Sequence, residues 1–144
     1  MIHSLHYFLN SNAASVNTNL GCVTMGNLCL TYTPTVYENL LATPVVPPPN
    51  TRAAPVIPAG AIGPGSAPLR YAHKAATIAF TMFQNMDRAL CQQILGSAEE
   101  KFVRVLHRPH RGYSGSITMD LLTHLYAMYA VITNADWITN DKRF

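Results

Sequence analysis

Apolar residues recur every three or four positions through much of the second half of the chain, a spacing typical of amphipathic helices. The longest stripe predicts a helix that ends at Gly96; its members are Ala72, Ala76, Ala79, Phe83, Met86, Leu90 and Ile94. A second stripe predicts a helix beginning near residues 116–118, with Asp120 favourably placed in its first turn. The buried seam of that helix comprises Leu122, Leu125, Tyr129 and Ile132, broadened by Leu121 and Tyr126.

Two shorter helices are predicted beside these. The segment Ser97–Glu100 is a capping-box pattern, so a helix should begin there and stop before Pro109. Its inward-facing residues are Phe102, Val103 and Leu106. A loop is expected over residues 108–115, and Thr133 or Asn134 can cap a fourth, short helix. That helix carries Asp136, Trp137 and Ile138.

Residues 1–43 form a separate N-terminal zone. Ser11–Leu20 has only weak helical character, because Asn and Thr are poor helix formers. Asn27–Thr33 alternates between two sets of side chains, which is compatible with a short strand. Pro34 suits the first turn of a short helix. The apolar face of that helix comprises Val36, Tyr37, Leu40 and Leu41.

Residues 44–68 form a connector rich in proline and glycine, with eight of the ten prolines of the chain. Proline removes backbone donors and glycine raises the entropic cost of ordering, so no packed core is expected here. Two PxxP spacings, Pro44–Pro47 and Pro55–Pro58, are typical of SH3 ligands, although such spacings also arise by chance wherever proline is dense. The chain therefore divides into an N-terminal zone, this linker and a helical domain over residues 69–144.

Charged residues make up only 12% of the chain, about half the usual share. So little charge favours self-association, because like-charge repulsion between copies is weak. The helix over residues 72–94 also favours self-association, because Ile78, Phe80 and Met82 lie off its main apolar stripe. Such a helix is buried either by further elements of the same protein or by a second subunit, and the sequence leaves both open.

No residue pattern indicates an enzyme, a cofactor site or a metal site. Three cysteines without CxxC spacing argue against a disulfide framework and a zinc site, and fit a reducing compartment. His107 and His110 lack an acidic or cysteine partner nearby in sequence, while Cys91 and His124 are expected to pack in helices. No secretory signal or membrane span is evident. We therefore expect a cytoplasmic protein without catalytic residues, metal ligands, cofactors, small-molecule substrates or membrane association.

The most distinctive charge feature is a basic run with no acidic residue between its members, namely Lys101, Arg104, Arg108 and Arg111. Spacings of three and four place the first three on one face of the predicted helix, with the fourth in the loop. Phosphate backbones reward such a cluster through counterion release, whatever the base sequence. The alternative is an ordinary solvated helix face, because charges without exposed aromatic residues among them are a weak nucleic-acid signal.

Several short segments of the sequence resemble those of a known protein family. They are Asn12–Val16, Asn19–Gly21, Gly26–Thr31, Pro58–Gly60, Phe83–Leu95, Leu121–Tyr129 and Ile132–Asp141. In this order they resemble the all-helical capsid region of Gag-like proteins from copia-type LTR retrotransposons. The resemblance runs from about Leu9 to Phe144, and it departs from the family over Cys22–Asn27, where a glycine-rich turn with histidines is usual. The family's later helices and zinc knuckle have no counterpart here, so a truncated copy is expected.

The resemblance implies a shell protein that self-associates through its helices and contacts RNA nonspecifically. The residues alone predict a mostly α fold with a small N-terminal zone, a proline-rich connector and a bundle of three to four helices, incomplete at its C-terminal end. One alternative function is a small helical interaction module that docks through the proline-rich segment. Another is a retroelement remnant without present function. We also expect the isolated chain to be only marginally stable.

Overall fold

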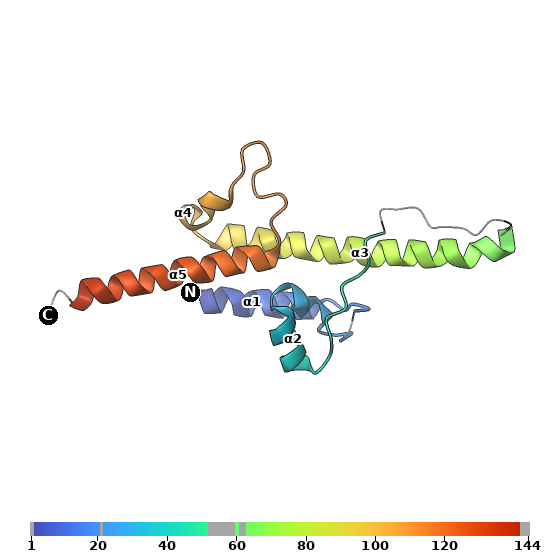
Figure 1. The fold of residues 1–144 in the computed structure, drawn as a ribbon, viewed down its shortest axis with the longest axis horizontal. Helices are drawn as coiled ribbons and strands as arrows, with labels where there is room; N and C mark the ends of the chain where they lie inside the picture. The colour runs from blue at the N-terminus through green and yellow to red at the C-terminus, as the bar shows by residue number, and fades with distance from the viewer. Residues whose placement is uncertain (1, 21, 52–59, 61–62, 142–144) are drawn as a thin grey trace.

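The structure is a computed structural model that describes residues 2–20, 22–51, 60 and 63–141, with the backbone alone for residues 63, 64 and 131–141. Within this part of the chain the fold is mostly helical and contains no strand, which confirms the predicted class. The helices are α1 (Ile2–Ser15), α2 (Pro34–Leu41), α3 (Gly63–Ser97), α4 (Glu100–Val103) and α5 (Thr118–Asp141), with 3-10 helices η1 (Gly26–Leu30) and η2 (Arg104–Leu106). Figure 1 shows an elongated molecule built along α3.

The core lies where α1, the C-terminal half of α3 and the first half of α5 run side by side (Figure 1). Its fully buried members are Leu9, Ala13, Ile94, Leu121, Leu122 and Leu125, with Leu90 and Val103 almost as deep. The residues of α3 and α5 in this set belong to the two stripes predicted from the sequence. Burying each large aliphatic side chain contributes about 1.5–3 kcal/mol, so these stripes determine which helix faces meet.

Helix α3 begins earlier than expected and extends well beyond the core. It starts at Gly63, so the last six residues of the predicted linker are helical. Pro68 is tolerated because it lies in the second turn, where its missing N–H removes a single bond near the helix end. At the other end α3 stops at Ser97, as the position of Gly96 predicted.

The predicted capping box at Ser97 is wrong. Ser97 is the last residue of α3, and the amide of Ala98 still donates to the Ile94 carbonyl at 2.9 Å. The N-cap of α4 is therefore Glu99, which makes no side-chain capping bond. Val103 is nevertheless buried and Phe102 and Leu106 are half-buried, so the predicted inward face is confirmed.

The N-terminal zone differs from the prediction in two respects. The first helix covers Ile2–Ser15, well before the expected Ser11–Leu20. The strand expected over Asn27–Thr33 is wrong, because η1 occupies most of it. The Asn27 side chain donates to the Val16 carbonyl at 3.0 Å, and the Thr31 amide donates back to the Leu28 carbonyl at 3.1 Å, which curls this segment tightly.

Helix α2 confirms the prediction made from Pro34. Thr33 is its N-cap, Pro34 occupies the first turn, and Ala42 ends it in the left-handed conformation with φ of 50°. Tyr37 is buried, whereas Val36 and Leu40 are exposed. Only part of the expected apolar face of α2 is therefore covered.

The separate fourth helix predicted near Thr133 is wrong, because α5 continues through it to Asp141. No glycine or proline interrupts residues 118–141, so the backbone ladder has no reason to break. Tyr126 and Tyr129 are half-buried beside the core. The side chains predicted to lie further along this helix, Ile132, Asp136, Trp137 and Ile138, fall outside the described residues, as do Pro55 and Pro58 of the linker.

Candidate functional site

The prediction that Lys101, Arg104 and Arg108 share one helix face is wrong. Lys101 lies in α4 and Arg104 in η2, but the chain leaves the helix at His107, whose ψ of 125° is extended. Arg108 consequently lies in a loop, not one turn beyond Arg104. All four basic side chains, Arg111 included, are exposed, and Arg111 lies in the loop as predicted.

The Lys101 side chain contacts two residues close to it in sequence, Glu99 and Phe102. Its Nζ lies 2.7 Å from the Glu99 carboxylate and 4.8 Å from the centroid of the Phe102 ring. Exposed pairs of this kind contribute little to stability, but each reduces the charge that Lys101 offers to a ligand. Arg104, Arg108 and Arg111 form no ion pair with any other described residue.

The loop between η2 and α5 is a compact turn. The Arg108 amide donates to the Gly112 carbonyl at 2.9 Å, and the Gly112 amide donates to the Arg108 carbonyl at 2.8 Å. His110 and Gly112 have positive φ values of 70° and 58°, which close the turn. Arg111 lies in the turn between the paired residues Arg108 and Gly112. Figure 1 shows the loop rising from the side of α3 opposite α1.

A groove of about 750 Å³ separates this loop from α3. The wall formed by α3 uses residues at helical spacing, so they share one face. They are Gln84, Asp87, Arg88, Cys91, Gln92 and Leu95, and the loop adds Arg111, Tyr113, Ser114, Gly115, Ser116 and Ile117. The groove thus combines Arg111 with Arg88, which the sequence pattern does not single out. Nothing local distinguishes Arg88, and only folding brings the loop to it.

At the floor of the groove, α3 is hydrogen-bonded to the start of α5. Asp87 Oδ1 accepts a hydrogen bond from the Thr118 amide at 3.0 Å, and the Thr118 hydroxyl donates to the Asp87 carbonyl at 3.1 Å. Cys91 Sγ lies 3.5 Å from the Thr118 hydroxyl and 3.6 Å from the Ser116 carbonyl. Burial, reinforced by the charges of Asp87 and Asp120, raises the pKa of the Cys91 thiol. Cys91 is therefore protonated at neutral pH and packs as a small hydrophobe.

The histidines do not converge on a metal. His124 is half-buried and its Nε2 lies 2.6 Å from the Phe102 carbonyl, which ties α5 to α4. His107 packs its ring edge against Tyr113, with centroids 5.2 Å apart. Among the described residues, no group of three or more potential metal ligands comes together.

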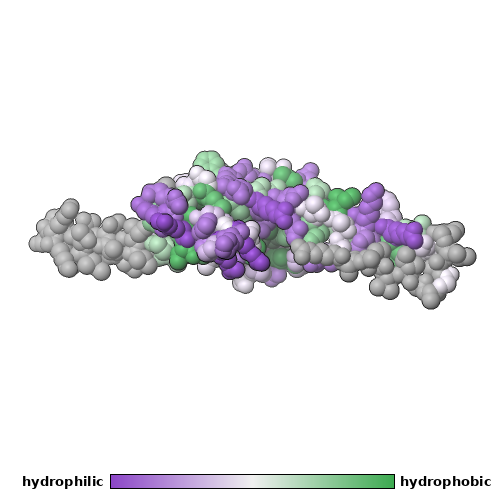
Figure 2. All heavy atoms as spheres, turned by 90° about the horizontal axis from the view of Figure 1, so that it is seen from above, coloured by the Kyte–Doolittle hydropathy of each residue, from purple (hydrophilic) through white to green (hydrophobic). Residues whose placement is uncertain are grey.

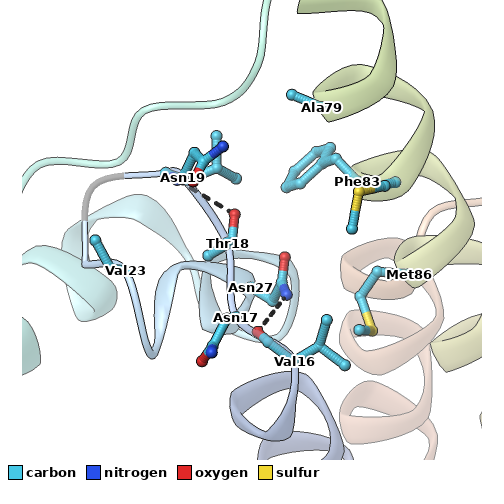
Figure 3. Close-up of a pocket in the computed structure, with 11 residues that line it drawn as sticks. Val16, Asn17, Thr18, Asn19, Val23, Asn27, Ala79, Phe83 and Met86 are labelled. Atoms are coloured by element: carbon cyan, nitrogen blue, oxygen red, sulfur yellow. Dashed lines mark hydrogen bonds between the residues drawn. The ribbon is translucent and has the colours of Figure 1, made fainter. Parts of the chain in front are cut away.

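A second, smaller cavity of about 230 Å³ lies between the segment after α1 and the middle of α3 (Figure 3). Figure 3 shows Val16 and Asn27 on one side, facing Phe83 and Met86 of α3. The Asn27 side chain donates to the Val16 carbonyl, and Asn17, Thr18 and Asn19 also line the cavity. Its wall on the α3 side is apolar, whereas the opposite wall is mixed.

The rim of this cavity continues into an exposed apolar stripe of α3. Tyr71, Ile78 and Met82 are separated by seven and four residues and so lie on one side of the helix. They are 78%, 52% and 55% exposed, and Met82 also lines the cavity. At the start of the predicted core stripe Ala72 is also exposed, whereas Ala76 and Ala79 are half-buried. The N-terminal half of α3 thus offers apolar surface on more than one side.

No helix in the described part of the chain combines the length and the apolar character needed to cross a bilayer. Comparison with known protein families, with curated proteins and with solved structures finds no match to this chain.

Proposed function

We propose that this chain is a non-enzymatic structural protein of the Gag-like kind, which self-associates through its helices and contacts RNA without reading its sequence. The observation that carries the proposal is the exposed stripe of Tyr71, Ile78 and Met82, which runs along α3 from the part beyond the core to the cavity at its middle. Exposed apolar surface of this extent on a helix favours contact with another protein surface. A second copy is the simplest partner, because the stripe is compatible with two-fold pairing.

The charges on α3 favour an antiparallel pair. Arg70 and Lys74 are the only Lys, Arg, Asp or Glu residues between positions 63 and 86, and both lie toward the helix start. In an antiparallel arrangement about a two-fold axis near Ile78, Lys74 of one copy lies beside the apolar Met82 region of the other. Like charges are then kept at opposite ends of the contact, where they do not repel.

The expected strength is modest. Two copies contribute six large apolar side chains, and covering each contributes about 1.5–3 kcal/mol at most. Association itself costs about 4–15 kcal/mol before any net affinity appears. The balance favours a weak and reversible contact, which suits a shell subunit that assembles when its local concentration rises.

Sedimentation velocity over a concentration series tests the self-association. The wild-type chain should show a mass that rises with concentration, and Ile78→Glu and Met82→Glu should shift the sedimentation profile toward the monomer. Leu40→Glu on α2 is the matched control, because Leu40 is equally apolar, exposed at 62% and distant from the stripe in sequence. A monomeric wild type, or equal effects of Leu40→Glu and Ile78→Glu, would contradict the proposal.

RNA contact is proposed for the exposed basic residues Lys101, Arg104, Arg108 and Arg111. Their guanidinium and ammonium groups can release counterions from a phosphate backbone whatever the base sequence. Charge reversal at Arg104 and Arg108 should weaken retention on immobilised RNA. Unchanged retention would remove these two residues from the interface.

A second candidate function is docking through the proline-rich segment. Residues 44–50 have no regular secondary structure, and Pro44, Pro47 and Pro49 are exposed, as a peptide ligand requires. A chain that stays monomeric at all concentrations, yet binds an SH3-type domain through residues 44–58, would favour this function over assembly.

A further inference from the structure

We propose that the groove between α3 and the loop over residues 107–117 binds a short stretch of single-stranded RNA. This inference rests on the proposed RNA contact, shares Arg111 with it and adds a groove that the other proposed basic residues do not line. At about 750 Å³ the groove is more than three times as large as the cavity of Figure 3, at about 230 Å³. Its size falls within the range of about 300–1,000 Å³ that is usual for small-ligand sites.

Two guanidinium groups reach this groove from different elements. Arg88 comes from α3 and Arg111 from the loop, and both side chains are exposed. Within the described residues neither arginine takes part in an ion pair. Arginine is suited to phosphate because its planar fork can donate two parallel hydrogen bonds. Successive phosphates of one strand can therefore be held by the two walls.

The nearby carboxylates are occupied by the start of α5. Asp87 accepts from the Thr118 amide at 3.0 Å, and Asp120 Oδ2 lies 3.5 Å from the Ile117 amide. The positive end of the α5 dipole offsets part of their charge. These acids hold the floor of the groove together and leave Arg88 and Arg111 available to an anion.

The groove also offers surfaces for bases. Tyr113 is half-buried, and the edge contact with His107 holds its ring in place at the groove wall. A base can stack on this ring whatever its identity. Gln84 and Gln92 add amides that donate and accept, so they can bond to the edge of any base.

This combination favours a single strand over a duplex. The bases of a duplex are stacked on one another, so its exterior would present phosphates to the arginines but no free base to Tyr113. A surface that recognised duplex RNA would be broad and basic, whereas this groove sets its two arginines beside Leu95, Tyr113 and Ile117. Figure 2 shows strongly hydrophilic residues mixed with apolar ones over the molecule seen from above. The groove is therefore assigned to unpaired nucleotides, with no preference for sequence.

Fluorescence anisotropy with a labelled poly-uridine oligonucleotide and the full chain tests this assignment. Arg88→Glu and Arg111→Glu should each weaken binding about fivefold or more, and the neutral variants Arg88→Gln and Arg111→Gln should lower the salt dependence by about one phosphate contact. Tyr113→Leu should weaken binding without changing the salt dependence. Circular dichroism confirms that each variant keeps its helices.

Arg70→Glu is the matched control, since it makes the same charge change at an exposed residue outside both the groove and the proposed basic contacts. If it weakens binding as much as Arg88→Glu and Arg111→Glu, net charge alone drives binding and the groove assignment is overturned while RNA contact stands. If the wild-type chain binds no RNA, both the groove and the proposed RNA contact fall, and self-association is judged separately by sedimentation. Duplex RNA that binds as tightly as the single strand would also overturn the assignment.

Discussion

His6 joins three helical segments through both of its ring nitrogens. Its Nε2 lies 2.9 Å from the Thr31 carbonyl after η1, and its Nδ1 lies 2.7 Å from the Tyr126 hydroxyl of α5. A carbonyl can only accept, so Nε2 carries the proton, and in the neutral ring Nδ1 accepts from the tyrosine. The His6 side chain of α1 thereby provides a hydrogen-bond partner for the Thr31 carbonyl after η1 and for the Tyr126 hydroxyl of α5.

His6→Ala should lower the free energy of unfolding by about 1–3 kcal/mol, because it leaves the Thr31 carbonyl and the Tyr126 hydroxyl without this partner. Urea denaturation followed by circular dichroism measures the change. His3→Ala is the control, since His3 is exposed and meets Tyr126 only through a ring contact. Equal stability of the two variants would show that the hydrogen bonds of His6 contribute nothing.

The Cys29 thiol provides a second test at this scale. Burial raises its pKa from 9.0 to about 11. At pH 8 only about one native thiol in a thousand is then ionised, so alkylation should be much slower in the folded chain than in urea. Peptide mapping by mass spectrometry after a short iodoacetamide pulse measures this, and equally fast labelling in both states would contradict it.

The same shift predicts a dependence of stability on pH. The unfolded thiol loses its proton near pH 9, whereas the native thiol keeps it until about pH 11. The native state therefore holds more protons in this interval, and the free energy of unfolding falls as the pH rises through it. Below pH 9 the contribution of this thiol is constant. Cys29→Ala should unfold with a weaker dependence on pH between 9 and 11.

At the scale of elements, two glycines make a matched pair. A Cβ at Gly26 would lie 2.5 Å from Thr18 Cγ2 and 3.0 Å from the Leu20 carbonyl oxygen, so Gly26→Ala should destabilise the chain by about 1–3 kcal/mol. A Cβ at Gly96 meets nothing within 4 Å. Gly96→Ala should raise stability by about 0.5–1 kcal/mol, because alanine is the better helix former. Thermal melts of both variants would contradict this account if their shifts had the same sign.

The sequence predicted those elements whose helical repeat is long enough to be unambiguous. The stripes of α3 and α5 and the proline start of α2 were predicted correctly. Helix α1 was misplaced, although Ile2, Leu5, Leu9 and Ala13 also step by three and four, because its asparagines obscured the pattern. The predicted strand failed because alternation over a few residues also fits a 3-10 segment, and side-chain bonds such as that of Asn27 decide between them.

The candidate site was less predictable than the fold. Arg111 was identified because it stands in a basic run, and Arg88 was missed because nothing local distinguishes it. The groove arises from a loop closed by positive φ at His110 and Gly112, and from the bond between Asp87 and Thr118. These are tertiary features, and periodicity along the sequence carries no information about them.

At the scale of the whole molecule, α3 joins a packed half to an extended half. Backbone amides over residues 86–95 lie in the core, while those over residues 70–80 belong to a helix with little cover. Hydrogen exchange at low concentration should therefore be much faster over residues 70–80. If the proposed self-association through Tyr71, Ile78 and Met82 takes place, protection should appear over the same residues at high concentration. Equal protection of both segments in the monomer would contradict the exposed state of this half.

The layout of the core has a consequence for how the chain is made. The apolar side of α1 is covered by α3 and α5, which follow it in the sequence. On the ribosome α1 therefore emerges long before its cover, and the core closes only after the first half of α5 has cleared the exit tunnel. Throughout that interval the nascent chain exposes Leu9 and its neighbours to solvent. The first surfaces that this helix meets are those of chaperones that bind apolar helices and of other copies of the chain on the same polysome.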